Sequence, residues 1–338
     1  MENENPQFLS RAVAGVQPTN KLHIGNYFGA VKQSIDLQKM VPYQNFCFVA
    51  DYHAQTIPDK KDQIADHSFE MAVSFLSLGM DPKFTVIYRQ SDIPEVLEIM
   101  WLLALRMNTS ELDRGHKMKV PGLKNAATYL YPLLMAADIL GLRANLVPVG
   151  DDQKQHLERA RQAARKFNSF FKEPILPLPE RALTKAGSVP GTDSTQYAGG
   201  RKMSKSYNNI VPIFCTDDET ETWVNGIVTQ AISYGQPITT EKDTVYNIYK
   251  LVTTTNASNK LKNGMESGQI GYEDAKNQLT AALNSYFAEA RDKRESYLKR
   301  PDDIWDILRE GAGRVRVEMR QTLDGMRELT GIGRYTRF

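Results

Sequence analysis

The sequence predicts an α/β protein in which a doubly wound parallel sheet is followed by an all-helical C-terminal domain. Short β-rich runs alternate with longer amphipathic stretches in the first half of the chain, which is typical of strands joined by crossover helices. After Phe214 the strand-like runs fade, and apolar residues recur at helical spacing. Because 338 residues exceed the usual size of one domain, we expect an α/β domain over 8–210 and a helical domain over 211–338.

The expected strands are short runs rich in β-branched and apolar residues, namely Arg11–Val16, Asn45–Ala50, Phe84–Tyr88 and Asn145–Val149. Five amphipathic stretches have lengths suited to right-handed crossovers: Gly25–Met40, Lys61–Met80, Pro94–Met107, Thr128–Leu140 and Gln153–Phe171. Ligands of such sheets bind beyond the carboxyl ends of the strands. Functional residues are therefore expected directly after each strand.

The second half of the chain contains two long helical patterns, Glu273–Tyr297 and Ile304–Met326. The α/β pattern is interrupted by the polar segment Lys185–Arg201, which contains four glycines. A connection of this length is uncommon in a compact domain. We expect this segment to be mobile or functional.

Charge and cysteine content exclude several classes of protein. Lys and Arg number 42 and Asp and Glu number 40, a net charge of +2, so an RNA contact must come from a local basic patch. Residues Met1–Gln7 lack the features of a signal peptide, and no apolar run reaches membrane-spanning length, which predicts a cytoplasmic protein. Only Cys47 and Cys215 are present, which excludes a four-cysteine metal site and a disulfide framework. No metal-ligating residues are predicted.

A first candidate motif follows the strand Arg11–Val16, where Gln17-Pro18-Thr19 leads into His23-Ile24-Gly25-Asn26 and a helix is expected to begin. Free backbone N–H groups and the positive end of the helix dipole favour a phosphate there. Gly25 has no side chain, so a nucleotide can approach the backbone closely. His23 and Asn26 can donate hydrogen bonds to phosphate or ribose oxygens. An ordinary loop with a solvated histidine is the alternative.

The second candidate motif is Lys202-Met203-Ser204-Lys205-Ser206, at the end of the glycine-bearing segment. Two lysines and two hydroxyls within five residues suit a pyrophosphate leaving group, because each lysine acts as a point charge on a flexible stem. A solvated basic turn is the alternative. A specified pentapeptide occurs by chance in such a chain on the order of once in ten thousand, which weakens that alternative.

These two motifs resemble the HIGH and KMSKS motifs of the class I aminoacyl-tRNA synthetases, and the similarity covers most of the chain. Gly15–Thr19, Gly25–Gly29 and Val147–Glu158 are more specifically similar to bacterial-type tryptophanyl-tRNA synthetases. The resemblance implies a Rossmann-like catalytic domain. It also implies tryptophan–tRNA ligase activity, in which ATP activates L-tryptophan to tryptophanyl-adenylate and the tryptophanyl group passes to tRNA(Trp).

The resemblance carries roles to matching positions of this chain. It makes His23, Asn26, Lys202 and Lys205 catalytic, and it assigns Gln153 to the amino acid. The implied ATP-binding residues are Gln17, Pro18, Thr19, Gly25, Asn26, Gly150, Asp151, Asp152, Val189, Lys202, Met203, Ser204, Lys205 and Ser206. The two adjacent acids among them look repulsive beside a triphosphate unless they face ribose hydroxyls, an ammonium group or Mg²⁺, and a helix N-cap is their alternative role.

An amino-acid pocket is indicated on the predicted helix Thr128–Leu140, where Tyr131, Met135 and Asp138 share one face. An aromatic ring and a thioether suit an indole, and a carboxylate can accept its single N–H donor. A plain core face explains Tyr131 and Met135 equally well. It explains Asp138 poorly, because Asp is rarely buried without a partner. The resemblance assigns the indole contact to Asp138.

Weaker candidates are Lys119 in the basic loop Asp113–Lys119, which can equally be a solvated loop, and Asp51 and His53, which follow the second strand. Arginines near the C-terminus are candidates for a tRNA surface, although each can equally lie on a solvated helix face: Arg314, Arg316, Arg320, Arg327, Arg334 and Arg337.

The resemblance further implies Mg²⁺ with ATP, and a homodimer that binds tRNA across both subunits. Three alternatives remain at this point. A tyrosyl enzyme would differ only in the pocket, and a small-molecule nucleotidyltransferase can share the first motif. A non-enzymatic RNA-binding relative would be expected to lack the phosphate lysines or Asp138, and this chain has them.

Overall fold

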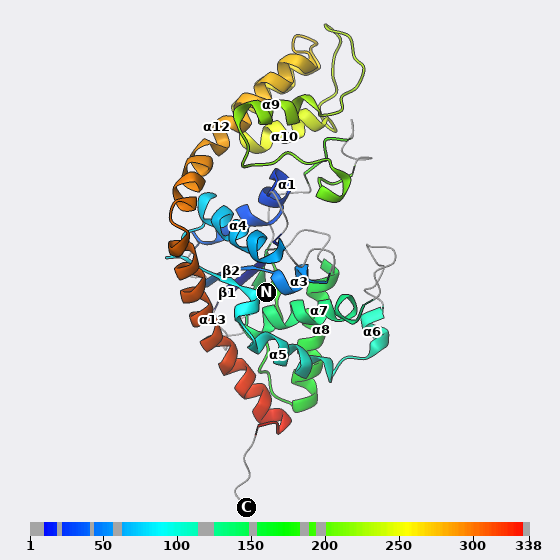
Figure 1. Cartoon of the computed structure of the whole chain (residues 1–338). Coiled ribbons are helices and arrows are strands. Elements are labelled where there is room, and N and C mark those ends of the chain that lie inside the picture. The colour runs from blue at the N-terminus through cyan, green and yellow to red at the C-terminus, as the bar shows by residue number, and fades with distance from the viewer. Residues whose placement is uncertain are drawn as a thin grey trace, which may run out of the picture. The chain divides into compact units, whose positions relative to one another are not determined.

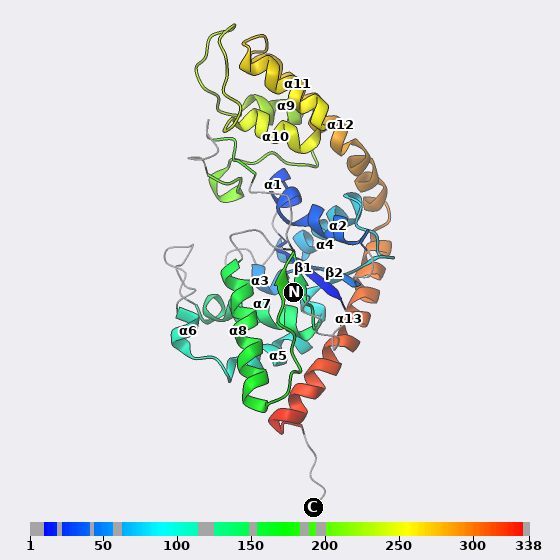
Figure 2. The ribbon, with the colours of Figure 1, turned by 180° about the vertical axis from the view of Figure 1, so that it is seen from behind.

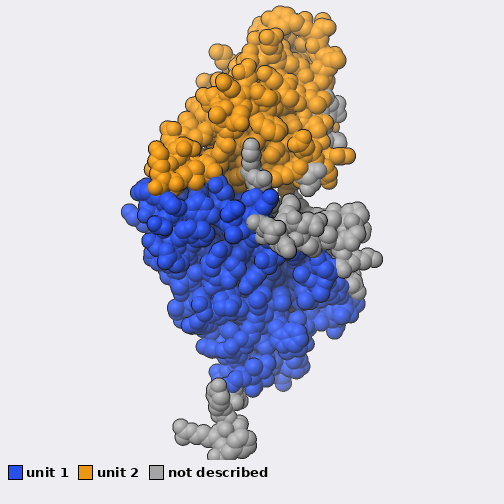
Figure 3. Space-filling view, viewed as in Figure 1, with its two compact units in different colours: residues 1–19, 33–184, 300–338 blue, residues 20–32, 185–299 orange. Residues whose placement is uncertain are grey.

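The computed structural model describes residues 10–18, 22–40, 44–56, 63–113, 125–148, 154–182, 189–193 and 201–333, apart from the side chains of Asp113 and Ser206. The chain divides into two compact units, which Figure 3 shows in different colours. Unit 1 contains residues 1–19, 33–184 and 300–338, and unit 2 contains residues 20–32 and 185–299. Both units are therefore discontinuous in sequence.

Unit 1 is built on a five-stranded sheet with the order β3-β2-β1-β4-β5, and every pairing is parallel. The strands are β1 Arg11–Val16, β2 Gln44–Val49, β3 Thr85–Arg89, β4 Leu146–Val147 and β5 Glu180–Arg181. The chain winds from β1 outward to β3 and then returns to β4 on the other side of β1, so the predicted doubly wound, Rossmann-like class is confirmed. The direction of winding reverses between β1 and β4, and ligands of such sheets bind at this point.

The helices of unit 1 surround the sheet in the two opposite views (Figures 1 and 2). They are α3 Asp51–Ala54, α4 Ile64–Ser77, the 3₁₀ turn η3 Gln90–Asp92, α5 Glu95–Ala104, α6 Thr109–Asp113, α7 Ala126–Gly141, α8 Lys154–Phe171 and α13 Pro301–Thr330, with most of α2 Lys32–Leu37. Helix α7 begins where Asn125 accepts the backbone N–H of Thr128 at 2.8 Å, a cap that satisfies an otherwise unpaired donor.

The predicted strands and crossover helices of the first half correspond to elements of the structure, with three main differences. The expected helix Gly25–Met40 is divided into α1 Ile24–Asn26, a π-helical turn η1 Tyr27–Val31 and α2. Strand β4 is two residues long, and the equally short β5 was not predicted. Strands this short carry almost no periodic signal, because the side-chain period of a strand is itself two residues.

Helix α13 belongs to unit 1, although the predicted boundary groups it with the helical domain. Its apolar face joins the core of the sheet, and it packs against β3 and α5. Gly311 lies so close to the backbone carbonyl of Ile87 on β3 that a Cβ atom would clash with it. The buried acid Glu95 on α5 accepts hydrogen bonds from Arg316 and Arg320 of α13. A helical period identifies a helix but not the surface on which it packs.

Unit 2 contains the remaining helices: α1, η1, the 3₁₀ turn η5 Lys205–Tyr207, α9 Asp217–Asn225, α10 Thr244–Val252, α11 Thr255–Glu266 and α12 Tyr272–Leu298. Helix α12 packs against α9 and α10. Tyr27 of η1 packs edge-on against Tyr286 and Phe287 of α12, with ring centroids 6.1 and 5.4 Å apart. The end of the first motif is thereby attached to the helical part of this unit.

Among the helices that the structure describes, none combines the length and the apolar composition needed to cross a membrane.

Candidate functional site

The first motif is held by a segment that lies far from it in sequence. The backbone N–H of Ile24 donates to the carbonyl of Val211 at 3.0 Å, and Ile213 donates to the carbonyl of Leu22 at 3.1 Å. His23 and Pro212 form an antiparallel bridge between these two bonds. The start of α1 is therefore fixed by the segment that directly follows the second motif.

His23 is an uncharged, buried side chain at the start of α1. It is 4% exposed. Burial, followed by the charges of Lys205 and Lys202, lowers the pKa of His23 to about 3, so the ring is neutral at physiological pH. Its Nδ1 atom has no hydrogen-bond partner among the described residues. A solvated loop histidine, the alternative raised by the sequence, does not fit this burial.

Gly25 allows the two predicted motifs to approach each other. A Cβ atom at Gly25 would lie 2.9 Å from atoms of the His23 ring and 3.1 Å from Cβ of Met203. Asn26, the last residue of the motif, is half-buried, and its Oδ1 lies 3.4 Å from the backbone N of His23. The absence of a side chain at position 25 thus serves the packing of the first motif against the second.

The second motif forms a short antiparallel pairing with the start of the glycine-bearing segment. Met203 donates its N–H to the carbonyl of Val189 at 2.9 Å, and Gly191 donates to the carbonyl of Arg201 at 2.9 Å. Met203 and Val189 are both 2% exposed, whereas Lys202 is exposed and Lys205 is half-buried. The apolar residues of this motif therefore anchor it, and its lysines are left closer to solvent.

Asn209 is a buried residue of this region that the motif search missed. Its Oδ1 accepts the backbone N–H of Ser204 at 2.7 Å, and its Nδ2 donates to Asp193 at 2.8 Å and to the carbonyl of Lys202 at 3.4 Å. The side chain is 0% exposed. A polar residue three positions beyond a lysine motif gives no sequence signal by itself, because such residues are common in turns.

The face of α7 proposed for the amino acid is divided between two environments. Tyr131 is half-buried, and its hydroxyl is hydrogen-bonded to Nε2 of His156 on α8 at 2.6 Å. Met135 is also half-buried and packs against the main core. Asp138 is 2% exposed. The plain core interpretation therefore applies partly to Met135, whereas Asp138 requires partners.

Asp138 finds these partners on α3 and η3, the turns that follow β2 and β3. Nε2 of His53 lies 3.1 Å from Oδ2 of Asp138, and Nε2 of Gln90 lies 2.9 and 2.8 Å from its two oxygens. Burial raises the pKa of Asp138, while the contacts with His53 and Gln90 oppose that rise. His53 was a candidate by position alone. Gln90 follows β3 directly, and the same strand-end rule could have identified it.

The neighbouring acid Asp51 is also buried and satisfied. It accepts the backbone N–H groups of Ser91 at 2.9 Å and Tyr52 at 3.0 Å, together with the hydroxyl of Ser91. Burial raises the pKa of Asp51, and these hydrogen bonds lower it. Asp51 thus connects α3 to η3 and supports the residues that contact Asp138.

Several predicted residues lie outside the described part of the chain: Thr19, Lys119, Gly150, Asp151, Asp152, Gln153, Arg334 and Arg337. Only the backbone of Ser206 is described. Gln17 is exposed and Pro18 is buried directly after β1, at the carboxyl end of that strand. No cluster of three or more potential metal-ligating side chains occurs within the described residues.

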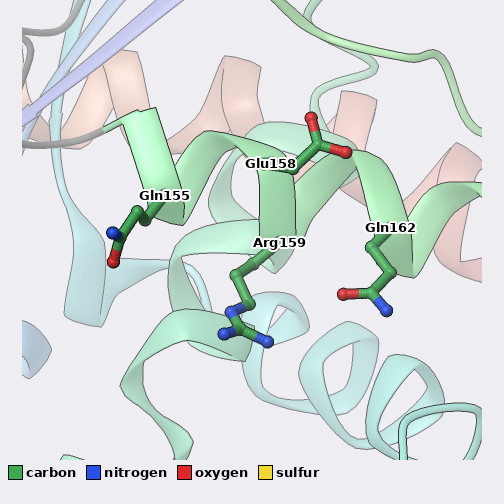
Figure 4. Close-up of a pocket in the computed structure, with 4 residues that line it drawn as sticks. All are labelled: Gln155, Glu158, Arg159 and Gln162. Carbon is green, nitrogen blue, oxygen red and sulfur yellow. The ribbon is translucent and has the colours of Figure 1, made fainter. Parts of the chain in front are cut away.

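A shallow hollow of about 270 Å³ lies on α8 and is lined by Gln155, Glu158, Arg159 and Gln162. Figure 4 shows that Glu158 extends to the opposite side of the helix from the other three side chains. None of the predicted site residues lines this hollow.

Of the candidate tRNA-binding arginines, Arg316 and Arg320 pair with Glu95 and Arg327 pairs with Glu98, so these three help to hold α13 on α5.

Comparisons with known proteins show the family to which the chain belongs. The model of the family described as tRNA synthetases class I (W and Y) matches residues 6–288. A protein of Fusobacterium nucleatum named tryptophan–tRNA ligase is 38% identical, and the alignment covers 96% of this chain and 98% of the relative. A Campylobacter jejuni protein of the same name is 37% identical over 95% of this chain and 100% of the relative.

Solved structures of tryptophanyl-tRNA synthetases are also similar to this chain. The crystal structure of tryptophanyl-tRNA synthetase from Campylobacter jejuni complexed with ADP and tryptophan has a TM-score of 0.83 and 37% identity, and the match covers 95% of this chain and 100% of that chain. An archaeal tyrosyl-tRNA synthetase from Archaeoglobus fulgidus has a TM-score of 0.63 at 20% identity, with 84% of this chain and 90% of that chain covered, so it shares the fold. On the family match and the bacterial relatives, the chain belongs to the tRNA synthetases class I (W and Y).

Proposed function

We propose that this protein is a tryptophan–tRNA ligase. The carboxylate of L-tryptophan attacks the α-phosphorus of ATP, which forms tryptophanyl-adenylate and releases pyrophosphate. A terminal hydroxyl of tRNA(Trp) then attacks the activated carbonyl, takes the tryptophanyl group and releases AMP. The bacterial relatives that are aligned over nearly their whole length carry this name, and they support the activity predicted from the sequence.

The observation that carries the proposal is the packing of the two motifs against each other: Met203 lies against Gly25. Burial, followed by the charges of Lys205 and Lys202, lowers the pKa of His23. Two lysines beside a neutral histidine and the start of a helix form a site for a polyphosphate, because all of these groups favour negative charge or donate hydrogen bonds to it.

In this proposal the reaction needs no side-chain nucleophile. Lys202 and Lys205 stabilise the negative charge that moves toward the leaving pyrophosphate, and His23 contributes as a neutral hydrogen-bond donor because its pKa is about 3. Asn26 adds a polar contact, and Gln17, Pro18 and Val189 line the nucleotide. Catalysis is then mainly positioning and electrostatic stabilisation.

Tryptophan selection is assigned to the cluster around Asp138. A buried carboxylate that accepts the indole N–H rejects substrates without that donor by roughly ten-thousand-fold, since its own acceptor would otherwise remain unpaired. Tyr131, Met135 and Gln153 complete the proposed amino-acid site. No separate editing domain is then needed to exclude phenylalanine.

Further parts of the proposal concern the partners. ATP enters with Mg²⁺ as its counterion, Asp151 and Asp152 belong to the nucleotide site with Gly150, and the protein acts in the cytoplasm. We also propose a homodimer. It is supported by an apolar stripe along α5 and its C-terminal cap, where Leu97, Trp101 and Leu105 are 41%, 59% and 47% exposed and recur at four-residue spacing.

Pyrophosphate exchange tests the activity directly. Radiolabelled pyrophosphate should be incorporated into ATP in the presence of tryptophan and not in the presence of tyrosine or phenylalanine. Exchange that depends on tyrosine would identify a tyrosyl enzyme. No exchange with any amino acid would favour a nucleotidyltransferase or an RNA-binding relative.

Equilibrium sedimentation of the same preparation tests the dimer, and a monomer at micromolar concentration would contradict it.

A further inference from the structure

The carboxylate of Asp138 is held from one side by an amide that no sequence motif identifies. Gln90 stands at the first position of η3, directly after β3. From its place in the structure we infer that Gln90 is a positioning residue for tryptophan selection: it keeps Asp138 an oriented, ionised acceptor for the indole N–H. This inference rests on the proposed function and specifies how its amino-acid site works.

The geometry of the contact is specific to Gln90. Its Nε2 lies 2.9 Å from Oδ1 and 2.8 Å from Oδ2 of Asp138, so one amide group spans both carboxylate oxygens. Gln90 is 1% exposed and Asp138 is 2% exposed, which keeps water from replacing the bond. The amide cannot turn over, because its carbonyl oxygen would then face the carboxylate and repel it.

A carboxylate in this environment needs such a donor to remain ionised. Burial is the largest influence on Asp138 and raises its pKa. A protonated carboxyl group carries a hydrogen that competes with the indole N–H, so its value as an acceptor falls. The contacts with His53 and Gln90 lower the pKa again. The donor that Gln90 supplies does not depend on pH, because an amide group does not ionise.

The remaining atoms of the cluster restrict what can face Asp138. The carbonyl oxygen of Gln90 has no hydrogen-bond partner among the described residues, so the buried cluster contains an acceptor in excess of its donors. The ionisable groups that interact with Asp138 are His53 and Asp51 from α3 and Tyr88 from β3. Tyr131 from α7 packs edge-on against the ring of His53. An incoming N–H donor matches this excess, and an apolar ring such as that of phenylalanine does not.

Two substitutions at Gln90 separate a positioning role from a merely structural one. Gln90→Met keeps the length of the side chain and removes the donor, so the pKa of Asp138 should rise further. We expect kcat/KM for tryptophan to fall about 10- to 100-fold near neutral pH, mainly through KM. The acid limb of its pH profile should move to higher pH. KM for ATP should stay unchanged.

Gln90→Glu keeps the shape of the side chain and should give the opposite pH signature. Two carboxyl groups at this distance share a proton, and the protonated Glu donates to Asp138 in place of the amide. Activity with tryptophan should therefore be near the wild-type level at low pH. It should fall as pH rises and the shared proton is lost, because two carboxylates then repel each other.

The control is Tyr88→Phe, which removes a buried hydroxyl without a partner among the described residues at the end of the same strand and leaves the ring stacked on Phe48. Its pH profile and amino-acid selectivity should match the wild type. The inference is overturned if both Gln90 variants keep the wild-type profile, or if both lose activity equally at every pH. A wild-type protein that fails to exchange pyrophosphate with tryptophan would instead refute the proposed function, and this inference with it.

Discussion

The two regions assigned to the reaction differ in how the chain builds them. The region proposed for phosphate in unit 2 consists of two contiguous motifs, each within a few residues of sequence, and short backbone pairings hold them in place. The region proposed for tryptophan in unit 1 is a buried polar cluster whose members come from three separate elements, α3, η3 and α7. A contiguous motif can be recognised in the sequence. The members of a cluster assembled by folding are far apart in the sequence, so they form no motif.

The physical demands on the two regions explain this difference. A polyphosphate is large, charged and partly hydrated, so lysines on flexible stems and backbone N–H groups suffice to bind it. An indole N–H offers a single donor, and selection depends on a fully desolvated acceptor. Such an acceptor must be supported from several directions, because a buried carboxylate without partners is strongly destabilising.

The largest effect is expected from Lys205→Ala. Loss of one donor to the developing charge should raise the barrier to adenylate formation by about 3 kcal/mol, or slow it on the order of 100-fold. Tryptophan binding should remain nearly intact, since that contact lies in the other region. Single-turnover formation of the adenylate measures the rate, and equilibrium dialysis measures binding. Lys260→Ala, at an exposed lysine of α11, is the control. An unchanged rate for Lys205→Ala would remove the proposed role.

Asp138→Ala should produce the complementary result. A hydrogen bond to a charged group contributes about 1.5–3 kcal/mol, so kcat/KM for tryptophan should fall about 10- to 100-fold while KM for ATP changes little. Discrimination against phenylalanine should weaken in the same exchange assay. If the ratio of kcat/KM for tryptophan to that for phenylalanine is the same as in the wild type, the indole contact is misassigned. The assignment of tryptophan selection to the region in unit 1 would then be wrong.

Asn209→Leu tests whether the phosphate region also depends on support assembled by folding. The substitution removes the acceptor for Ser204 and the donor to Asp193, and each lost bond in a buried place costs about 1–3 kcal/mol. Adenylate formation should slow with little change in KM for tryptophan. Thermal unfolding, followed by circular dichroism, separates a local effect from general instability. A variant with wild-type kinetics would show that the lysine motif is sufficient without this support.

The smallest expected effect is on stability and comes from His23. Its pKa is about 3 in the folded protein against 6.5 for an ordinary histidine, so the unfolded chain binds a proton over this interval and the folded chain does not. Stability is therefore complete above about pH 6.5 and declines as pH falls toward 3. Between pH 7 and 5.5 the loss should be about 1 kcal/mol. Urea unfolding of wild type and His23→Gln at both pH values measures it, and equal pH dependence of the two proteins would contradict the buried, neutral state.

Most of the fold and part of the candidate site could be predicted from the sequence. Strands β1 to β3 and the crossover helices follow from periodicity, and the resemblance to class I synthetases was carried by the two motifs. The chain's membership of the tRNA synthetases class I (W and Y) is confirmed by the family match. The roles of individual site residues remain predictions, and those at 150–153 lie outside the described residues.

What the sequence determined by itself is local: the helical and strand periods, the glycine at position 25 that leaves the backbone open to close approach, and the lysines that favour a polyphosphate. Only the tertiary structure decided which residues support one another. It placed α13 on the sheet through Gly311, gave Asp138 its partners His53 and Gln90, and joined Asn209 to the second motif. These contacts link residues far apart in the chain or lie within irregular turns, and neither kind leaves a periodic pattern, because burial and hydrogen bonding are satisfied in space rather than along the sequence.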